Sequence, residues 1–126
     1  MLYADDDADD KAWVSEACQA VNAPLSIYFV KDGREVFDYL KAKQQESLPG
    51  LIILDLNMPL LDGRQTLQQL KANPAYQHIP VAIVSTSSSR IDKEVCQRLG
   101  AAIFLVKPTS YANWQLIIHQ LLSVAR

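Results

Sequence analysis

The sequence lacks any apolar stretch that approaches the roughly 20 residues needed to span a membrane. Its N-terminus also lacks the order of basic, apolar and small residues that marks a signal peptide. No internal repeat, low-complexity tract or linker is present. These absences predict a soluble, cytoplasmic protein that does not bind a membrane.

The sequence has only two cysteines, and its basic residues do not outnumber its acidic ones. The two cysteines, Cys18 and Cys96, lie far apart in helical patterns, so we expect two reduced thiols in the core. The 12 Lys and Arg residues face 14 Asp and Glu residues, which gives a net charge of −2. Bulk charge therefore gives no support to direct binding of nucleic acid.

The acidic residues are unevenly distributed. Five of the 14 lie within the first ten residues, at positions 5, 6, 7, 9 and 10. A solvated tail or an acid-rich helix N-terminus would explain such a run, and we expect Asp9 and Asp10 to play this helix-start role. Asp5 and Asp6 directly follow a strand-like run, which favours a different role for them.

Strand-like and helix-like patterns alternate five times in the 126 residues. We expect strands at 2–4, 27–30, 51–54, 81–84 and 102–106, and helices at 9–22, 34–45, 64–73, 91–99 and 110–125. This alternation predicts an α/β protein: a (βα)5, flavodoxin-like, doubly wound parallel sheet with strand order 2-1-3-4-5. We expect a single domain over residues 1–126 without an output domain, in which Trp13 packs the first helix onto the sheet.

Polar groups follow four of the predicted strands, at the sheet edge where such folds bind ligands. These groups are Asp5-Asp6-Asp7, Asp55, Ser85-Thr86 and Lys107-Pro108. Crowded carboxylates repel one another, and a hard cation such as Mg²⁺ relieves the repulsion. Asp55 could then attack phosphorus, with Lys107 and the Ser85 hydroxyl neutralising phosphoryl oxygens. Alone, Lys107 could be a surface lysine and Ser85 a loop or cap residue.

These residues resemble the receiver domains of two-component response regulators over essentially the whole chain. The resemblance rests on the segments 2–7, 51–59 with Asp62-Gly63, 84–86 and 106–108. The stretch from Asp55 through Met58-Pro59 to Asp62-Gly63 is specific, and the acidic cluster upstream and Lys-Pro downstream make a chance match improbable.

The resemblance implies a role for each matched residue at the phosphorylation site. Asp55 would be the phosphoacceptor. Asp6 would bind Mg²⁺ directly, Asp5 would bind it through water, and Asn57 would offer its backbone carbonyl. Lys107 would neutralise the phosphoryl group.

The resemblance also implies a switch and a set of partners. Ser85 and Phe104 would be the switch residues, and the Lys107–Pro108 peptide bond would be cis. A histidine kinase or histidine phosphotransfer protein would donate the phosphoryl group, as in regulators paired with phytochrome-type or hybrid kinases. The fourth helix, fifth strand and fifth helix would then bind a downstream protein or a second copy. The chain would catalyse only its own phosphorylation and dephosphorylation.

The fifth helix is richer in apolar residues than one buried face requires, which favours a docking surface there. Its apolar residues are Tyr111, Trp114, Leu116, Ile117, Ile118, Leu121 and Leu122. Ordinary core packing with scattered exposed residues is the alternative.

Three other functions fit part of the pattern. A haloacid-dehalogenase-like phosphohydrolase would use Asp5 of an Asp-x-Asp motif as nucleophile, but Ala8-Asp9-Asp10 replaces the Thr and apolar residues expected next, and a cap insertion is missing. A flavodoxin-like FMN binder would need a Ser/Thr-rich loop where the aspartates would repel phosphate. A receiver that docks partners without phosphorylation is the third alternative.

Overall fold

The computed structural model describes residues 1–21, 26–43 and 47–125. Strands and helices alternate along them in the order β1 (Leu2–Ala4), α1 (Ala8–Ala20), β2 (Tyr28–Val30), α2 (Gly33–Ala42), β3 (Ile52–Leu54), α3 (Gly63–Ala72), β4 (Val81–Ser85), α4 (Arg90–Arg98), β5 (Ile103–Val106) and α5 (Tyr111–Val124). The strands form one parallel sheet in the order β2-β1-β3-β4-β5. The predicted fold class and strand order are therefore confirmed, although single element ends differ by a few residues.

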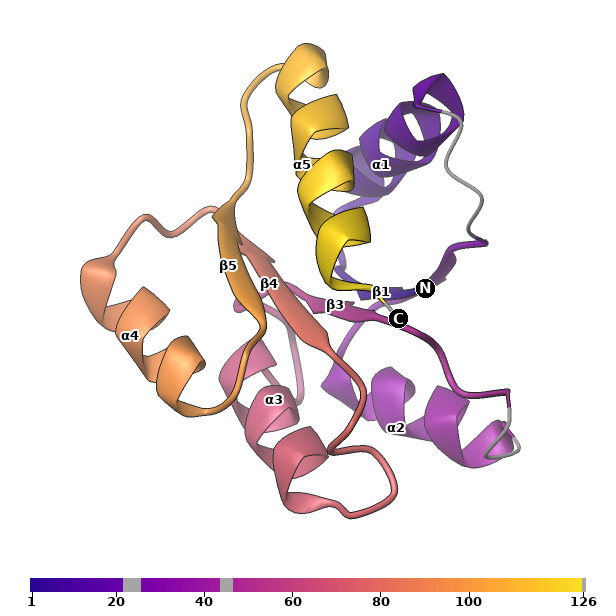
Figure 1. The fold of residues 1–126 in the computed structure, drawn as a ribbon, viewed down its shortest axis with the longest axis vertical. Coiled ribbons are helices and arrows are strands. Elements are labelled where there is room, and N and C mark those ends of the chain that lie inside the picture. Colours follow the sequence, from indigo (N-terminus) through magenta and orange to yellow (C-terminus); the bar gives the residue numbers. More distant parts are fainter. Residues whose placement is uncertain (22–25, 44–46, 126) are drawn as a thin grey trace.

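Helices cover both faces of the sheet, and each face has its own core (Figure 1). Helices α1 and α5 lie on one face, where Val14, Ala17, Trp114 and Ile118 are buried against Tyr3. Helices α2, α3 and α4 lie on the other face. Their buried residues on that side include Val36, Leu40, Leu67, Leu70 and Cys96.

Strand β1 is short but central. Its three residues are buried and pair in parallel with both β2 and β3, so that Ala4 faces Val30 on one side and Leu54 on the other. The residues that follow Ala4 and Leu54 are Asp5 and Asp55. This register brings the two carboxylates out of the sheet side by side.

Two local expectations are wrong. Trp13 is 37% exposed, because the buried stripe of α1 is formed by Val14, Ala17 and Cys18, and residue 13 is rotated away from it. The described residues contain no cis peptide bond, so the Lys107–Pro108 bond is trans. The trans form of an X–Pro bond is intrinsically favoured by about 0.5–1 kcal/mol, and here Lys107 reaches its partners with it.

Other expectations from the composition agree with the structure. Cys18 and Cys96 are both buried and unpaired. Within the described part of the chain, no helix combines the length and the apolar character needed to cross a membrane.

Candidate functional site

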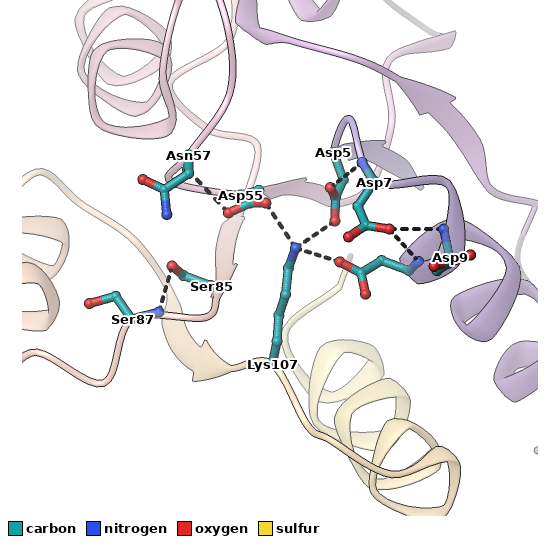
Figure 2. A network of polar contacts seen from close by, with 9 residues as sticks. Asp5, Asp7, Asp9, Asp55, Asn57, Ser85, Ser87 and Lys107 are labelled. Carbon is teal, nitrogen blue, oxygen red and sulfur yellow. Dashed lines mark hydrogen bonds and ion pairs between the residues drawn. The ribbon is translucent and has the colours of Figure 1, made fainter.

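The carboxyl edge of the sheet brings three of the predicted residues into direct contact (Figure 2). Lys107 Nζ lies 2.9 Å from Asp5 Oδ2 and 2.8 Å from Asp55 Oδ2. The side chain of Lys107 is only 7% exposed, and both aspartates are buried. Charges from β1, β3 and β5 thus meet in a nearly closed site, where electrostatic interactions are stronger than in water.

Backbone hydrogen bonds fix how these residues leave the strands. The Asp5 N–H donates to the Val30 carbonyl, and the Asp55 N–H donates to the Ala4 carbonyl, both at 3.0 Å. The Lys107 N–H donates to the Ser85 carbonyl at 2.7 Å. The parallel ladders therefore continue past the strand ends and hold the site residues in register.

A third carboxylate contacts Lys107 that sequence reasoning did not assign to the site. Asp10 Oδ2 lies 2.6 Å from Lys107 Nζ. Asp10 lies in the first turn of α1, as expected, and its contact with Lys107 is an additional role that was not predicted from the sequence. Its position in the sequence could have indicated this contact. Helix α1 begins shortly after β1 ends, so a residue in its first turn stays close to the carboxyl edge of the sheet.

The cluster perturbs the protonation of its members. Burial disfavours the charge of Lys107, but hydrogen bonds to Asp10, Asp55 and Asp5 outweigh it and raise the pKa of the ammonium. Burial raises the pKa of Asp5 to about 6, and the hydrogen bond from Lys107 only partly opposes this shift. Three carboxyl groups thus share a single ammonium group in this site.

Three carboxylates form a group that could hold a metal ion. One oxygen each from Asp5, Asp6 and Asp55 lies within 4.8 Å of the others, with Asp5 and Asp55 buried and Asp6 exposed. Hard oxygen donors with room for retained waters on one exposed side suit Mg²⁺ or Mn²⁺. The residues present therefore fit the expected cation.

The neighbours of these carboxylates have other roles. Asp7 is the N-cap of α1: its side chain accepts hydrogen bonds from the N–H groups of Asp9 and Asp10, and its own N–H donates to Asp5 Oδ1 at 2.9 Å. The Asn57 N–H donates to Asp55 Oδ1 at 3.2 Å, which keeps the backbone of residue 57 beside the cluster.

Neither of the two predicted switch residues has a side-chain hydrogen bond to Lys107 or Asp55 among the described residues. Ser85 is buried at the end of β4, and its hydroxyl oxygen accepts a hydrogen bond from the Ser87 N–H at 3.1 Å (Figure 2). Among the described residues it has no hydrogen bond to Asp55. Phe104 in β5 is half-buried against the core on the α2, α3 and α4 side.

A polar network ties the loop after Ser85 to two helices. The Ser87 hydroxyl donates to Asp92 Oδ2 at 2.7 Å, and Arg64 pairs with the other oxygen of Asp92. The hydrogen bonds from Ser87 and Arg64 lower the pKa of Asp92. Since Arg64 belongs to α3 and Asp92 to α4, the network joins both helices to the loop, and nothing in the sequence pattern predicted it.

Comparisons with known proteins point to one family. The family model of the response regulator receiver domain matches residues 1–119. Response regulator Rcp1 of Synechocystis is 29% identical over 110 residues, which cover 85% of this chain and 75% of Rcp1. Some relatives are much longer: the matched region covers 24% of the chemotaxis protein CheV2 of Helicobacter pylori.

Solved structures give the same result. The phosphorylated cyanobacterial phytochrome response regulator RcpA is similar with a TM-score of 0.84 at 29% identity, covering 99% of this chain and 95% of RcpA. The Mn²⁺-bound form of Rcp1 has a TM-score of 0.81 at 28% identity, covering 98% and 95% of the two chains.

Proposed function

Since the chain belongs to the response regulator receiver domain family, we propose that it accepts a phosphoryl group on Asp55 and passes the change to a partner protein. The observation that carries this proposal is the contact of the Lys107 ammonium with Asp55 at 2.8 Å, beside a group of carboxylates that fits a divalent cation. Phosphoryl transfer depends mainly on positioning and charge neutralisation, and this site offers both.

The proposed reaction transfers a phosphoryl group from a phosphohistidine to a carboxylate. A carboxylate oxygen of Asp55 attacks phosphorus in line, a P–O bond forms, and the P–N bond to the donor imidazole breaks. Lys107 holds a phosphoryl oxygen that gains charge during transfer. Mg²⁺ bound by Asp6, Asp55, the Asn57 carbonyl and, through water, Asp5 would neutralise further charge.

The proposed donor is a histidine kinase or a histidine phosphotransfer protein. The similarity to RcpA, a phytochrome response regulator, makes a phytochrome-type kinase the first candidate to test. The cation is proposed as Mg²⁺, with support from the acidic group formed by Asp5, Asp6 and Asp55 and from the Mn²⁺-bound form of the related Rcp1.

The proposed output surface consists of α4, β5 and α5. After phosphorylation, the Ser85 hydroxyl would move to the phosphoryl group and Phe104 would turn inward, which would change the shape of this surface. Each of its three elements carries an exposed apolar residue: Ile91 in α4, Val106 in β5 and Leu116 in α5. These residues support docking of a downstream protein or a second copy. The side chain of Tyr111, which was also expected there, lies outside the described residues.

Labelling with acetyl phosphate and Mg²⁺, read by intact mass, tests the proposed function. Asp55→Asn is expected to abolish the phosphoryl adduct, whereas the control Asp38→Asn, on the exposed surface of α2, retains it. If Asp5→Asn alone abolished labelling, the phosphohydrolase alternative with Asp5 as nucleophile would hold. A wild-type protein that binds Mg²⁺ but stays unlabelled would indicate docking without phosphorylation.

A further inference from the structure

Asp10 differs from the other two carboxylates that contact Lys107. The Lys107 ammonium has three donor hydrogens, and the structure gives it three carboxylate partners: Asp5, Asp10 and Asp55. Asp5 and Asp55 belong to the group that fits a cation, and Asp10 does not. Asp10 is also the nearest of the three, with its Oδ2 at 2.6 Å from Nζ.

The proposed reaction changes two of these three partners. A bound cation would share the oxygens and the charge of Asp5 and Asp55. Phosphorylation would then turn one carboxylate oxygen of Asp55 into the bridging oxygen of an acyl phosphate, so that negative charge moves from the carboxyl group to the phosphoryl oxygens. Asp10 is the one partner of Lys107 that belongs neither to the group that fits a cation nor to the proposed phosphoacceptor.

The position of Asp10 is itself fixed by the chain. Asp7 caps α1 and accepts hydrogen bonds from the N–H groups of Asp9 and Asp10, at 2.9 and 3.3 Å. The Asp7 N–H donates in turn to Asp5 Oδ1. A helix-start acid usually reaches solvent or the N-cap backbone, but the side chain of Asp10 is 21% exposed and is directed at Lys107 instead.

Lysine benefits more than most residues from such an anchor. Its four-carbon stem loses up to about 2 kcal/mol of rotamer entropy when it is immobilised, and a charge that waits in place for the transition state needs no reorganisation. A partner that does not change would hold the lysine side chain in place before phosphorylation, so its rotamer entropy would already be lost in the resting protein. The other two donor hydrogens of the ammonium could then change their partners as the oxygens of Asp5 and residue 55 bind a cation or a phosphoryl group.

We propose that Asp10 is a positioning residue for phosphoryl transfer, which holds the Lys107 ammonium over Asp55 while the other partners of Lys107 change. The proposal rests on the proposed function of Asp55. A merely structural role at the start of α1 would require the acid but not its contact with Lys107, and this difference can be tested.

The test compares Asp10→Asn, Asp10→Glu and the control Asp9→Asn, an exposed acid in the same helical turn that does not contact Lys107. The measured quantities are the maximal phosphorylation rate with acetyl phosphate and the half-saturating Mg²⁺ concentration. Asp10→Asn is expected to lower the maximal rate by about tenfold or more, because positioning effects of this size follow small displacements. The half-saturating Mg²⁺ concentration should stay within about threefold. Asp10→Glu should recover part of the rate, and Asp9→Asn should retain it.

A second readout does not depend on phosphorylation. In ¹⁵N-lysine-labelled protein without cation, slow hydrogen exchange of the Lys107 ammonium, assigned by its loss in Lys107→Arg, reports whether the ammonium is held. We expect the slow signal in the wild type and in Asp9→Asn, and its loss in Asp10→Asn. A wild-type maximal rate in Asp10→Asn, or an equal loss in Asp9→Asn, would overturn the proposal. An unlabelled wild type would refute the function of Asp55, and the ammonium signal would still decide whether Asp10 holds Lys107.

Discussion

Gly63 packs directly against the backbone of Asp55, the proposed phosphoacceptor. A Cβ atom at residue 63 would lie 2.4 Å from the Asp55 carbonyl oxygen and 2.8 Å from Leu56 Cα. The Gly63 N–H donates to the Leu56 carbonyl at 3.1 Å, and Asp62 starts α3 with a capping box that involves Gln65. The Asp62-Gly63 pair thus places the start of α3 against the end of β3, where only a residue without a Cβ atom fits beside the Asp55 backbone.

Replacement of Gly63 by alanine is therefore expected to displace the backbone of Asp55. The atoms in the way are main-chain atoms that cannot rotate aside, so we expect a loss of about 1–3 kcal/mol in the free energy of unfolding and a slower phosphorylation of Asp55. Gly100→Ala is the control, because residue 100 has φ +104° but its nearest neighbours are side-chain atoms of Lys71. It should cost about 1–2 kcal/mol from backbone strain and leave the phosphorylation rate unchanged. Denaturant unfolding measures the free energy of unfolding, and acetyl phosphate labelling measures the phosphorylation rate. Equal phosphorylation rates in Gly63→Ala and Gly100→Ala would refute the role of Gly63.

The raised pKa of Asp5 predicts how stability depends on pH. Burial brings the pKa of Asp5 to about 6 in the folded protein, whereas an exposed aspartate titrates near about 3.9. Between these values the folded state binds more protons than the unfolded state, so the contribution of Asp5 to stability falls as pH rises from about 4 to 6. A cation that binds Asp5 displaces this proton and should stabilise the protein more at pH 7 than at pH 5.

Thermal unfolding of the wild type and Asp5→Asn at pH 5 and pH 7, with and without Mg²⁺, tests the predicted pH dependence of stability. Without cation, Asp5→Asn should have the higher unfolding temperature at pH 7 and lose this advantage at pH 5. If the difference between the two proteins were the same at both pH values, Asp5 would not be the titrating group.

The strand-end rule was sufficient to predict the central part of the site. Asp5, Asp55 and Lys107 lie at most one residue beyond strands whose apolar runs are plain in the sequence, and parallel strands bring their carboxyl ends to one edge. The short β1 was also visible as a three-residue apolar start. The register pairs Ala4 with Leu54, so Asp5 and Asp55 leave the sheet next to each other. Their proximity could therefore be predicted without knowing any side-chain conformation.

The features that were missed depend on side-chain direction. Neighbouring helical residues point about 100° apart, so either Trp13 or Val14 could face the core. The predicted helix bounds did not determine which of the two does, and the structure buries Val14. Asp10 and the Arg64–Asp92 pair join elements through long-range contacts whose geometry is set by packing. Periodicity identifies elements and their buried faces, but it does not show which charged side chains meet across them.

The hydroxyl of Tyr3 predicts an unusual response to mutation. Tyr3 is fully buried, its ring lies 5.7 Å from that of Phe29 between centroids, and its hydroxyl has no hydrogen-bond partner among the described residues. A buried polar group without a partner costs about 1–3 kcal/mol. Tyr3→Phe should therefore raise the free energy of unfolding, while Tyr28→Phe, at a 56% exposed site, should leave it unchanged. A lower stability of Tyr3→Phe in denaturant unfolding would mean that the hydroxyl is satisfied by a buried water.

The network around Asp92 predicts a change in the switching equilibrium. If Ser85 moves to the phosphoryl group, its hydrogen bond from the Ser87 N–H must break or rearrange, and the Ser87 hydroxyl is itself held by Asp92. Asp92→Ala removes this restraint, so the loop should reach the phosphorylated conformation more readily. Because Arg64 and Asp92 are partly exposed, the expected effect is modest, about a two- to fivefold longer lifetime of the phosphorylated form.

Decay of the phosphorylated protein after removal of acetyl phosphate measures this lifetime. Glu94→Ala, an exposed acid of the same helix, is the matched control and should decay like the wild type. Ser87→Ala should lengthen the lifetime as Asp92→Ala does, and the double variant should add little, because both substitutions break the same hydrogen bond. Additive effects, or a shorter lifetime in Asp92→Ala, would mean that Asp92 does not restrain the loop through Ser87.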